Sequence, residues 1–335
     1  MERFNNWMWY TYDNLLPNQP KLLKNSKLQL HFNKSYQPKK INYFESLFRN
    51  ARLLSEIYKG PFDVMLSGGI DSEVIVRVFH ELKIPQNVYT FKFENNYNIL
   101  DVMNAETLCK DLNIKLNLID FNLEKFFEND AEYYYKVSFP SVIEKLVRFD
   151  FYKYMDNIPV VGDGEPYWVR NLWNLPKKSD WSMAFYEHDY AHATYSKAIN
   201  RTIIGEWYQF TPEIWISFME IDYVKKLLND QIPNKLSSWS YRDELHRHLW
   251  PGIRNKPKLI GYEGDQNPTK ARIPPFMAKF KEEFFQKEEA EFRFTKPILE
   301  NMFEKNYTVD LDDPKFFKTF HSLKKNYYIK KYETN

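Results

Sequence analysis

A glycine-containing turn between two apolar segments carries the residue types best suited to chemistry. The turn consists of Ser67, Gly68, Gly69, Ile70, Asp71 and Ser72. Adjacent glycines remove the side chains that would keep an anion away from the backbone, and both serines add hydroxyl donors. The carboxylate of Asp71 suits a metal ion or the first turn of a helix. The turn therefore predicts a site for a phosphate-bearing ligand.

The segments on either side of the turn indicate where it lies in a fold. Residues 62–66 form a short apolar run that predicts a strand, and residues 73–82 predict a helix with one apolar face. A turn of this kind follows the carboxyl end of a strand, where open parallel sheets bind their ligands. The first N–H groups of the helix have no partners within it, and we expect them to point at the ligand.

The six residues of the turn resemble the PP-loop of N-type ATP pyrophosphatases, whose pattern is Ser-Gly-Gly-x-Asp-Ser. No Gly-Lys-Ser/Thr follows the glycines, so the turn is not a Walker A loop. The family includes asparagine synthetase, GMP synthetase, NAD synthetase and several tRNA-modifying enzymes. The resemblance implies that ATP is cut between its α and β phosphates, that AMP passes to a substrate oxygen, and that the loop holds pyrophosphate. The alternative is a turn that only caps a helix.

Composition limits the classes of protein to consider. The 335 residues are enough for two domains or one large one, and the hydrophobic content of 43% is enough for a substantial core. Nothing in the net charge of +2 argues for a strong nucleic-acid or membrane partner. Cys109 is the only cysteine, which excludes an intrachain disulfide and a multi-cysteine zinc site. Without a signal-like or membrane-length apolar run, we expect a cytoplasmic protein.

A repeated strand-then-helix rhythm indicates the fold class. Strands are predicted at residues 62–66, 87–93, 115–120 and 158–161. Helices are predicted at residues 73–82 and 100–112 and within 123–157, with a break near Pro140. This alternation predicts right-handed crossovers and an α/β fold with a doubly wound parallel sheet, of the adenine nucleotide alpha hydrolase-like kind that the resemblance implies.

Three parts of the chain are expected on this basis. An N-terminal extension would span residues 1–59, the PP-loop domain 60–166, and a mostly helical region 167–335, which closes the active site and ends in a solvated tail. The extension contains a predicted strand at 27–32 and a predicted helix at 41–58. It is too short for the glutaminase domain of asparagine synthetase, so the resemblance is to the synthetase half alone.

A second acidic motif follows the strand predicted at 158–161. It reads Gly162, Asp163, Gly164, Glu165, Pro166. In asparagine synthetase and its relatives, a similar motif helps bind Mg²⁺ on the pyrophosphate side. The resemblance therefore implies that Asp71 and one of Asp163 and Glu165 hold Mg²⁺, with Gly162 and Gly164 beside the nucleotide. Pro166 stands where the family has Asp, so the choice between the two acids stays open, and an exposed acidic turn is the alternative.

A basic stretch late in the chain supplies candidate catalytic residues. Asparagine-synthetase-like enzymes have a basic residue from their C-terminal part that offsets charge building between the α and β phosphates. Lys258 and Lys256 are the candidates for this role, and Arg254 is a candidate phosphate clamp. A solvated basic loop is the alternative.

The sequence thus predicts an ATP- and Mg²⁺-dependent, AMP-forming carbon–nitrogen ligase. A carboxylate or amide oxygen of a small or macromolecular acceptor would be adenylated and then attacked by ammonia or an amine. One rival is a tRNA- or nucleic-acid-modifying enzyme with the same ATP chemistry, which the near-neutral charge disfavours. Another is a nucleotide-binding or structural protein that has lost catalysis, which the irregular second motif favours.

Overall fold

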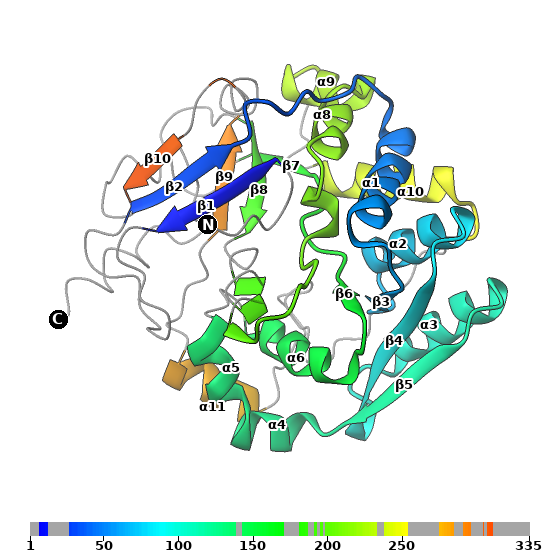
Figure 1. Cartoon of the computed structure of the whole chain (residues 1–335), viewed down its shortest axis with the longest axis vertical. Coiled ribbons are helices and arrows are strands. Elements are labelled where there is room, and N and C mark those ends of the chain that lie inside the picture. Colours follow the sequence, from blue (N-terminus) through cyan, green and yellow to red (C-terminus); the bar gives the residue numbers. More distant parts are fainter. Residues whose placement is uncertain are drawn as a thin grey trace.

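A four-stranded parallel sheet organises the chain (Figure 1). The computed structural model describes residues 7–12, 27–138, 143–170, 181–186, 191–192, 195–196, 198–232, 238–253, 275–284, 291–295, 304 and 307–310. The sheet consists of β3 (Phe62–Met65), β4 (Gln86–Phe93), β5 (Leu116–Phe121) and β6 (Ile158–Val160). Its strand order is β5-β4-β3-β6, with Val64 opposite Val88 and Val160.

The strand order places a topological switch between β3 and β6. After β3 the chain moves to β4 and β5 on one side, and then returns to β6 on the other side. Ligands of open parallel sheets bind outside the carboxyl ends of the strands at such a point. The turn at residues 67–72 follows β3, and the second acidic motif follows β6, so both lie at this edge of the sheet.

Helices cover both faces of the sheet, as the alternating sequence predicts. They are α1 (Tyr43–Tyr58), α2 (Ile70–Glu81), α3 (Ile99–Asp111), α4 (Leu123–Asn129), α5 (Ala131–Ser138) and α6 (Glu144–Phe151), with short 3₁₀ turns at Glu94–Asn96, Tyr152–Tyr154 and Trp207–Gln209. The described part of residues 123–157 therefore contains three short α-helices and a 3₁₀ turn, and Pro140 lies outside the described residues.

Two apolar cores lie on the opposite faces of the sheet. Alternate residues of a strand point to opposite faces, so Val64 and Val88 join the core beneath α1, α2 and α3. Met65 and Phe91 join the other core, which α4, α5, α6 and α11 cover. Every residue of β3 is buried, as expected for a parallel strand covered on both faces. The predicted α/β doubly wound fold is thus confirmed.

The remaining described elements combine helices with two antiparallel sheets that the sequence analysis did not predict. The helices are α8 (Glu213–Met219), α9 (Asp222–Leu228), α10 (Trp239–Leu249) and α11 (Pro275–Phe284). One sheet has the order β7-β8-β9, formed by Trp168–Arg170, Trp181–Tyr186 and Glu291–Thr295. The other has the order β1-β2-β10, formed by Met8–Tyr12, Lys27–Phe32 and Tyr307–Asp310.

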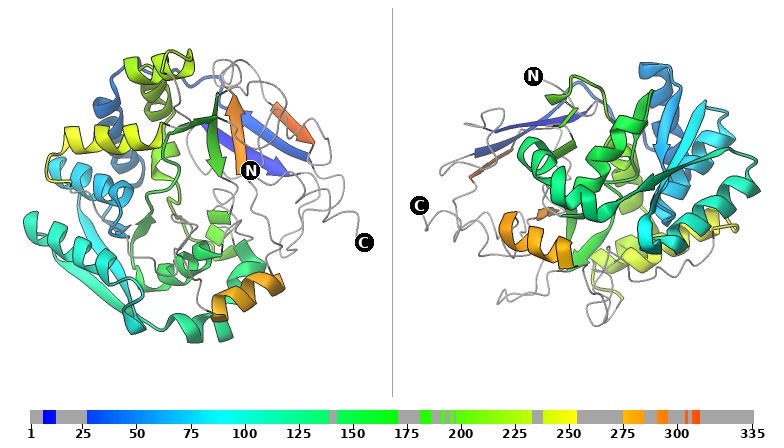
Figure 2. Two further views of the ribbon diagram at one scale, coloured as in Figure 1. Left: turned by 180° about the vertical axis from the view of Figure 1, so that it is seen from behind. Right: turned by 90° about the horizontal axis from the view of Figure 1, so that it is seen from below.

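One contact between distant segments matters for the site. Helix α10 packs against α2, and the view from behind shows the yellow α10 next to the lighter blue α2 (Figure 2). This packing brings residues near position 242 to the helix that follows the glycine turn. Within the described part of the chain, no helix has both the length and the apolar character needed to cross a membrane.

Candidate functional site

The turn after β3 has the backbone shape of an anion cradle. Gly68 has φ +71°, and a Cβ atom there would lie 2.5 Å from the carbonyl oxygen of Asp101. Only glycine fits this combination of positive φ and close packing. Gly69 is the N-cap of α2, and no side chain of the described residues caps this helix end. The first N–H groups of α2 are therefore presented at the carboxyl edge of the sheet.

The two serines of the turn differ in their contacts. The backbone N–H of Ser67 donates to Ser72 Oγ (3.1 Å), and Ser72 Oγ donates to the carbonyl of Gly69 (3.1 Å). The hydroxyl oxygens of the two serines are 3.1 Å apart. Buried Ser72 therefore holds the shape of the turn, whereas Ser67 is partly exposed and faces a cleft.

The cleft beside Ser67 has mainly apolar walls. It is lined by Met65, Leu66, Ser67, Thr90, Phe91, Phe93, Asn98, Asp101, Val147, Arg148 and Phe151. The side chain of Asn98 accepts from the N–H of Phe93 (2.9 Å) and donates to the carbonyl of Phe91 (2.8 Å), which fixes the end of β4. Aromatic and aliphatic walls with a few polar groups are typical of sites for a flat organic ring.

Asp71 and Glu165 both contact one buried arginine. Arg242 of α10 is 1% exposed, and its Nη2 lies 3.2 Å from Asp71 Oδ1. Its Nη1 lies 3.3 Å from Glu165 Oε1, and its Nη2 also lies 3.2 Å from Asp243 Oδ1. Burial on its own lowers the pKa of Arg242, but the charges of Asp71, Glu165 and Asp243 outweigh it and raise that pKa. The guanidinium is thus a fixed positive charge between the two predicted metal ligands.

Asp163 has a different pair of cations. Lys145 and Arg148, one turn apart on α6, both donate to Asp163 Oδ2, the lysine at 2.5 Å. Burial lowers the pKa of Lys145, the charge of Arg148 lowers it further, and Asp163 opposes both effects. Arg148 is 25% exposed and also lines the cleft beside Ser67. A side chain that neutralises Asp163 therefore also faces the cleft.

A buried histidine completes the group around Asp163. His192 Nδ1 is 2.8 Å from the hydroxyl of Tyr152, and its Nε2 is 3.6 Å from Asp163 Oδ2. The pKa of His192 is lowered to about 4, mainly by burial; Asp163 opposes this effect, and the charges of Lys145 and Arg148 add to it. His192 is therefore neutral at pH 7.

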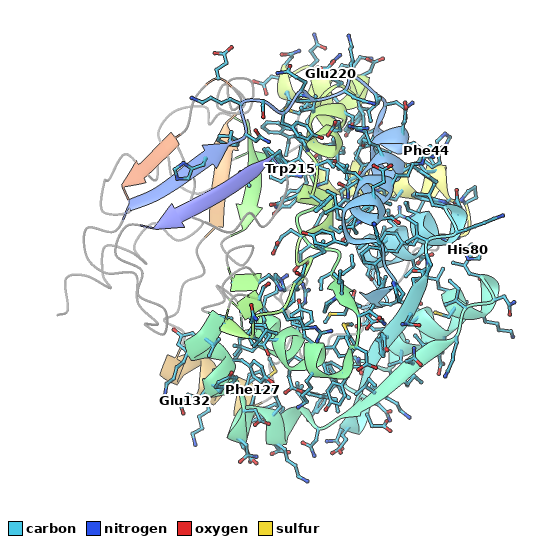
Figure 3. All side chains as sticks on the ribbon, viewed as in Figure 1. Phe44, His80, Phe127, Glu132, Trp215 and Glu220 are labelled. Carbon is cyan, nitrogen blue, oxygen red and sulfur yellow. The ribbon has the colours of Figure 1, made fainter. Side chains whose placement is uncertain are left out.

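The two glycines of the second motif allow β6 to approach the turn. A Cβ atom at Gly162 would lie 3.0 Å from the backbone N of Ser72. Gly164 has φ +79°, and its carbonyl accepts from Nε1 of Trp215, a residue labelled in Figure 3 (3.1 Å). The motif therefore packs directly on the first turn of α2.

The predicted magnesium ligands do not fit that ion as they are arranged. Mg²⁺ needs a near-octahedral shell of oxygen ligands at about 2.0–2.1 Å, whereas Arg242 contacts both Asp71 and Glu165 and two cations contact Asp163. Among the described residues, no group of three or more His, Cys, Asp or Glu is placed to hold a metal ion. Three of the predicted residues, Arg254, Lys256 and Lys258, lie outside the described residues.

Sequence reasoning missed the cations that contact the acidic motifs. The spacing of Lys145 and Arg148 on one helical face is a usable signal, because residues three apart on a helix are neighbours. Arg242 offers no such signal, since it lies 171 residues from Asp71 along the chain.

Comparisons with known proteins give structural matches only. No protein-family model matches the sequence, and no curated protein matches it. One solved structure, an NMN synthetase from Francisella tularensis, has 15% identity and a TM-score of 0.29, over 67% of this chain and 100% of that one. An NH3-dependent NAD synthetase from Campylobacter jejuni in complex with the nitrate ion has 15% identity and a TM-score of 0.30, over 74% and 95%.

Proposed function

We propose that this chain binds ATP at the turn of residues 67–72 and is an AMP-forming carbon–nitrogen ligase of the PP-loop family, similar to the synthetase half of asparagine synthetase. One observation carries the proposal. The uncapped N-terminus of α2, shaped by Gly68 at φ +71°, adjoins an aromatic-walled cleft at the carboxyl edge of a parallel sheet. This arrangement suits a nucleotide whose ring lies in the cleft and whose phosphates lie on the helix end.

The charges around the turn suit the transfer of an adenylyl group. In the proposed reaction a carboxylate or amide oxygen of the acceptor attacks the α-phosphorus, the α–β bond breaks, and pyrophosphate leaves. Ammonia or an amine then attacks the activated carbon, and AMP leaves. The N–H groups of α2 stabilise the departing pyrophosphate, and Arg148 supplies positive charge from the cleft wall. Because orientation and charge stabilisation drive such a reaction, no covalent enzyme nucleophile is required.

A second candidate is a nucleotide-binding protein without turnover. The contacts of Arg242 with Asp71 and Glu165 favour it, because both carboxylates that would hold a catalytic metal ion face a protein cation instead. Binding at the α2 N-terminus does not need those carboxylates, so this candidate shares the nucleotide site and differs only in chemistry.

Turnover of ATP labelled at the α-phosphate separates the two candidates. The purified full chain is incubated with ammonia and a panel of small carboxylic acids, and the labelled product is identified. An AMP-forming ligase releases AMP that carries the label and pyrophosphate that does not. Labelled ADP would overturn the ligase proposal. ATP binding without any labelled product would favour the second candidate.

A variant of the turn tests whether ATP binds where we propose. Gly69→Val adds a side chain in front of the helix end, and φ −88° at this position is accessible to valine. ATP should raise the melting temperature of the wild type but not of the folded variant, since a ligand that binds the native state stabilises it. Equal stabilisation of both proteins would show that ATP binds elsewhere.

The late basic stretch is tested in the same assay. If Lys258 offsets charge at the breaking bond, Lys258→Met lowers turnover and leaves ATP binding unchanged, which is the signature of an interaction made in the transition state. Lys256→Met is the second variant to test. Normal turnover by both variants would remove this stretch from the mechanism.

A further inference from the structure

We propose that Arg242 takes the place of a divalent cation between Asp71 and Glu165, so that ATP binds at the turn without a metal ion held by these carboxylates, and that removing the guanidinium creates a divalent-cation site. The nucleotide part of this inference rests on the proposed function. The metal part concerns the three side chains alone.

The contacts give one guanidinium the position that a shared metal ion would have. Its Nη2 contacts Asp71 at 3.2 Å and its Nη1 contacts Glu165 at 3.3 Å. Arginine presents several donors in a planar fork, which lets one side chain bridge two carboxylates. The Arg242 side chain is 1% exposed, against 27% for Asp71 and 15% for Glu165. The cation is therefore more deeply buried than either carboxylate.

The surrounding structure holds Arg242 in this position. At the start of α10, Ser238 and Trp168 exchange two hydrogen bonds, Trp168 N–H to Ser238 Oγ (2.7 Å) and Ser238 N–H to the Trp168 carbonyl (2.8 Å). Further along α10, His246 Nε2 lies 3.0 Å from the hydroxyl of buried Tyr43 on α1. The hydroxyl of Tyr208 donates to the Asp71 carbonyl at 3.0 Å. Helix α10 and the backbone of Asp71 are thus both anchored around the ion pair.

The positive charge of Arg242 opposes binding of a metal ion between Asp71 and Glu165. Arginine keeps its proton at every pH at which the protein is handled. A divalent cation between Asp71 and Glu165 would stand within a few ångströms of a positive charge that is 1% exposed, and burial strengthens the repulsion between like charges. The metal ion can enter only if the guanidinium leaves, and the contacts of α10 oppose that movement.

Binding of Mn²⁺ alone tests the metal part. Free Mn²⁺ is measured by electron paramagnetic resonance in titrations of wild type, Arg242→Gln, Arg242→Lys and Arg77→Gln. Arg77 is the matched control. Like Arg242 it pairs with a carboxylate on α2, but its partner is Glu73 (2.8 Å) and not Asp71 or Glu165. We expect one Mn²⁺ per chain in Arg242→Gln, bound at least about tenfold more tightly than in the other three proteins.

Two outcomes of this titration would overturn the inference. The first is a stoichiometric Mn²⁺ site in the wild type that Asp71→Asn abolishes, which would mean that the carboxylates take a metal ion with Arg242 in place. The second is a folded Arg242→Gln variant that binds Mn²⁺ no better than Arg77→Gln. If Arg242→Gln does not fold, the wild type and Asp71→Asn still decide the question through the first outcome.

Binding of ATP tests the nucleotide part. The melting temperature of the wild type is measured with ATP in the presence of either EDTA or Mg²⁺. We expect similar stabilisation in both, and a Mg²⁺ requirement that Asp71→Asn removes would contradict the inference. If ATP stabilises the wild type under neither condition, the proposed function fails, and the Mn²⁺ titration still judges the role of Arg242.

Discussion

Two arginines flank the glycine turn, and they differ in burial rather than in chemistry. Arg242 on α10 is 1% exposed and contacts Asp71, Glu165 and Asp243. Arg148 on α6 is 25% exposed, contacts Asp163 and lines the cleft beside Ser67. A ligand can reach only a side chain that solvent can reach. Arg242 can therefore hold carboxylates in place, whereas Arg148 can also contact a phosphate.

The carboxylates that the two arginines contact also differ in which cations they contact. Asp163 receives hydrogen bonds from Lys145 as well as from Arg148, so it keeps a buried cation when Arg148 is removed. Asp71 and Glu165 both contact the guanidinium of Arg242. Loss of Arg242 should therefore affect stability, and loss of Arg148 should affect ligand binding.

The largest expected effect is that of Arg242→Met on stability. Asp71 and Glu165 would lose the buried cation that they contact, and breaking a buried ion pair costs about 3–5 kcal/mol. We expect the free energy of unfolding in urea to fall by that amount, whereas Arg148→Met should change it by less than about 1 kcal/mol, as is usual for partly exposed pairs. Equal losses in the two variants would erase the distinction between the arginines.

The next effect concerns pH and the cluster on the α6 side. His192 has a pKa of about 4 in the folded protein, lowered mainly by burial, against 6.5 in the unfolded chain. The unfolded state therefore binds more protons between these values, and stability falls as pH drops from 6.5 to 4, by up to about 3 kcal/mol.

Denaturation in urea across this pH range measures the contribution of His192. His192→Asn should lose less stability than the wild type between pH 6.5 and 4, because the titrating ring is gone. His248→Asn, at an exposed position of α10, is the control and should follow the wild type. A wild-type slope in His192→Asn would show that other groups carry the dependence.

The parts of the site that the sequence predicts are those with local causes. The strand, the turn and α2 follow from neighbouring residues: an apolar run, adjacent glycines, and apolar positions at helical spacing. The observed α2 begins at Ile70, three residues before the predicted start, because Gly69 itself is the N-cap. The predicted strand at 87–93 agrees with β4 to within one residue, because it too follows from the pattern of neighbouring residues.

The parts that it does not predict depend on distant segments. Strand β8 pairs with β9, with Met183 opposite Phe294, and neither segment identifies its partner by local pattern. The pairing of Arg242 with Asp71 likewise depends on the packing of α10 against α2. Sequence reasoning placed carboxylates correctly at the ends of β3 and β6, but the cations that face them come from other helices.

A smaller effect than those on stability is expected for Arg148→Met on ATP binding. Hydrogen bonds to a charged partner contribute about 1.5–3 kcal/mol, so the dissociation constant for ATP should rise by about tenfold to a hundredfold. Lys153→Met is the control, because Lys153 contacts Asp150 (2.7 Å) and does not line the cleft. Calorimetric titration measures both, and unchanged affinity in Arg148→Met would remove Arg148 from the nucleotide site.

The smallest effect, on the affinity of ATP for Asp163→Asn, has a sign that separates two roles for Asp163. If Asp163 serves to hold Lys145 and Arg148, its neutralisation raises the positive charge beside the cleft, and ATP should bind severalfold more tightly, on the order of threefold, at low ionic strength. If Asp163 instead held Mg²⁺, the same change would weaken binding in the presence of Mg²⁺. Titration of ATP with Mg²⁺ at two salt concentrations distinguishes these cases, since a gain from unscreened charge shrinks as salt rises. Weaker binding of ATP to Asp163→Asn in the presence of Mg²⁺ would indicate that Asp163 is a metal ligand. Arg242 would then be the arginine that occupies a predicted metal position, and Arg148 would not.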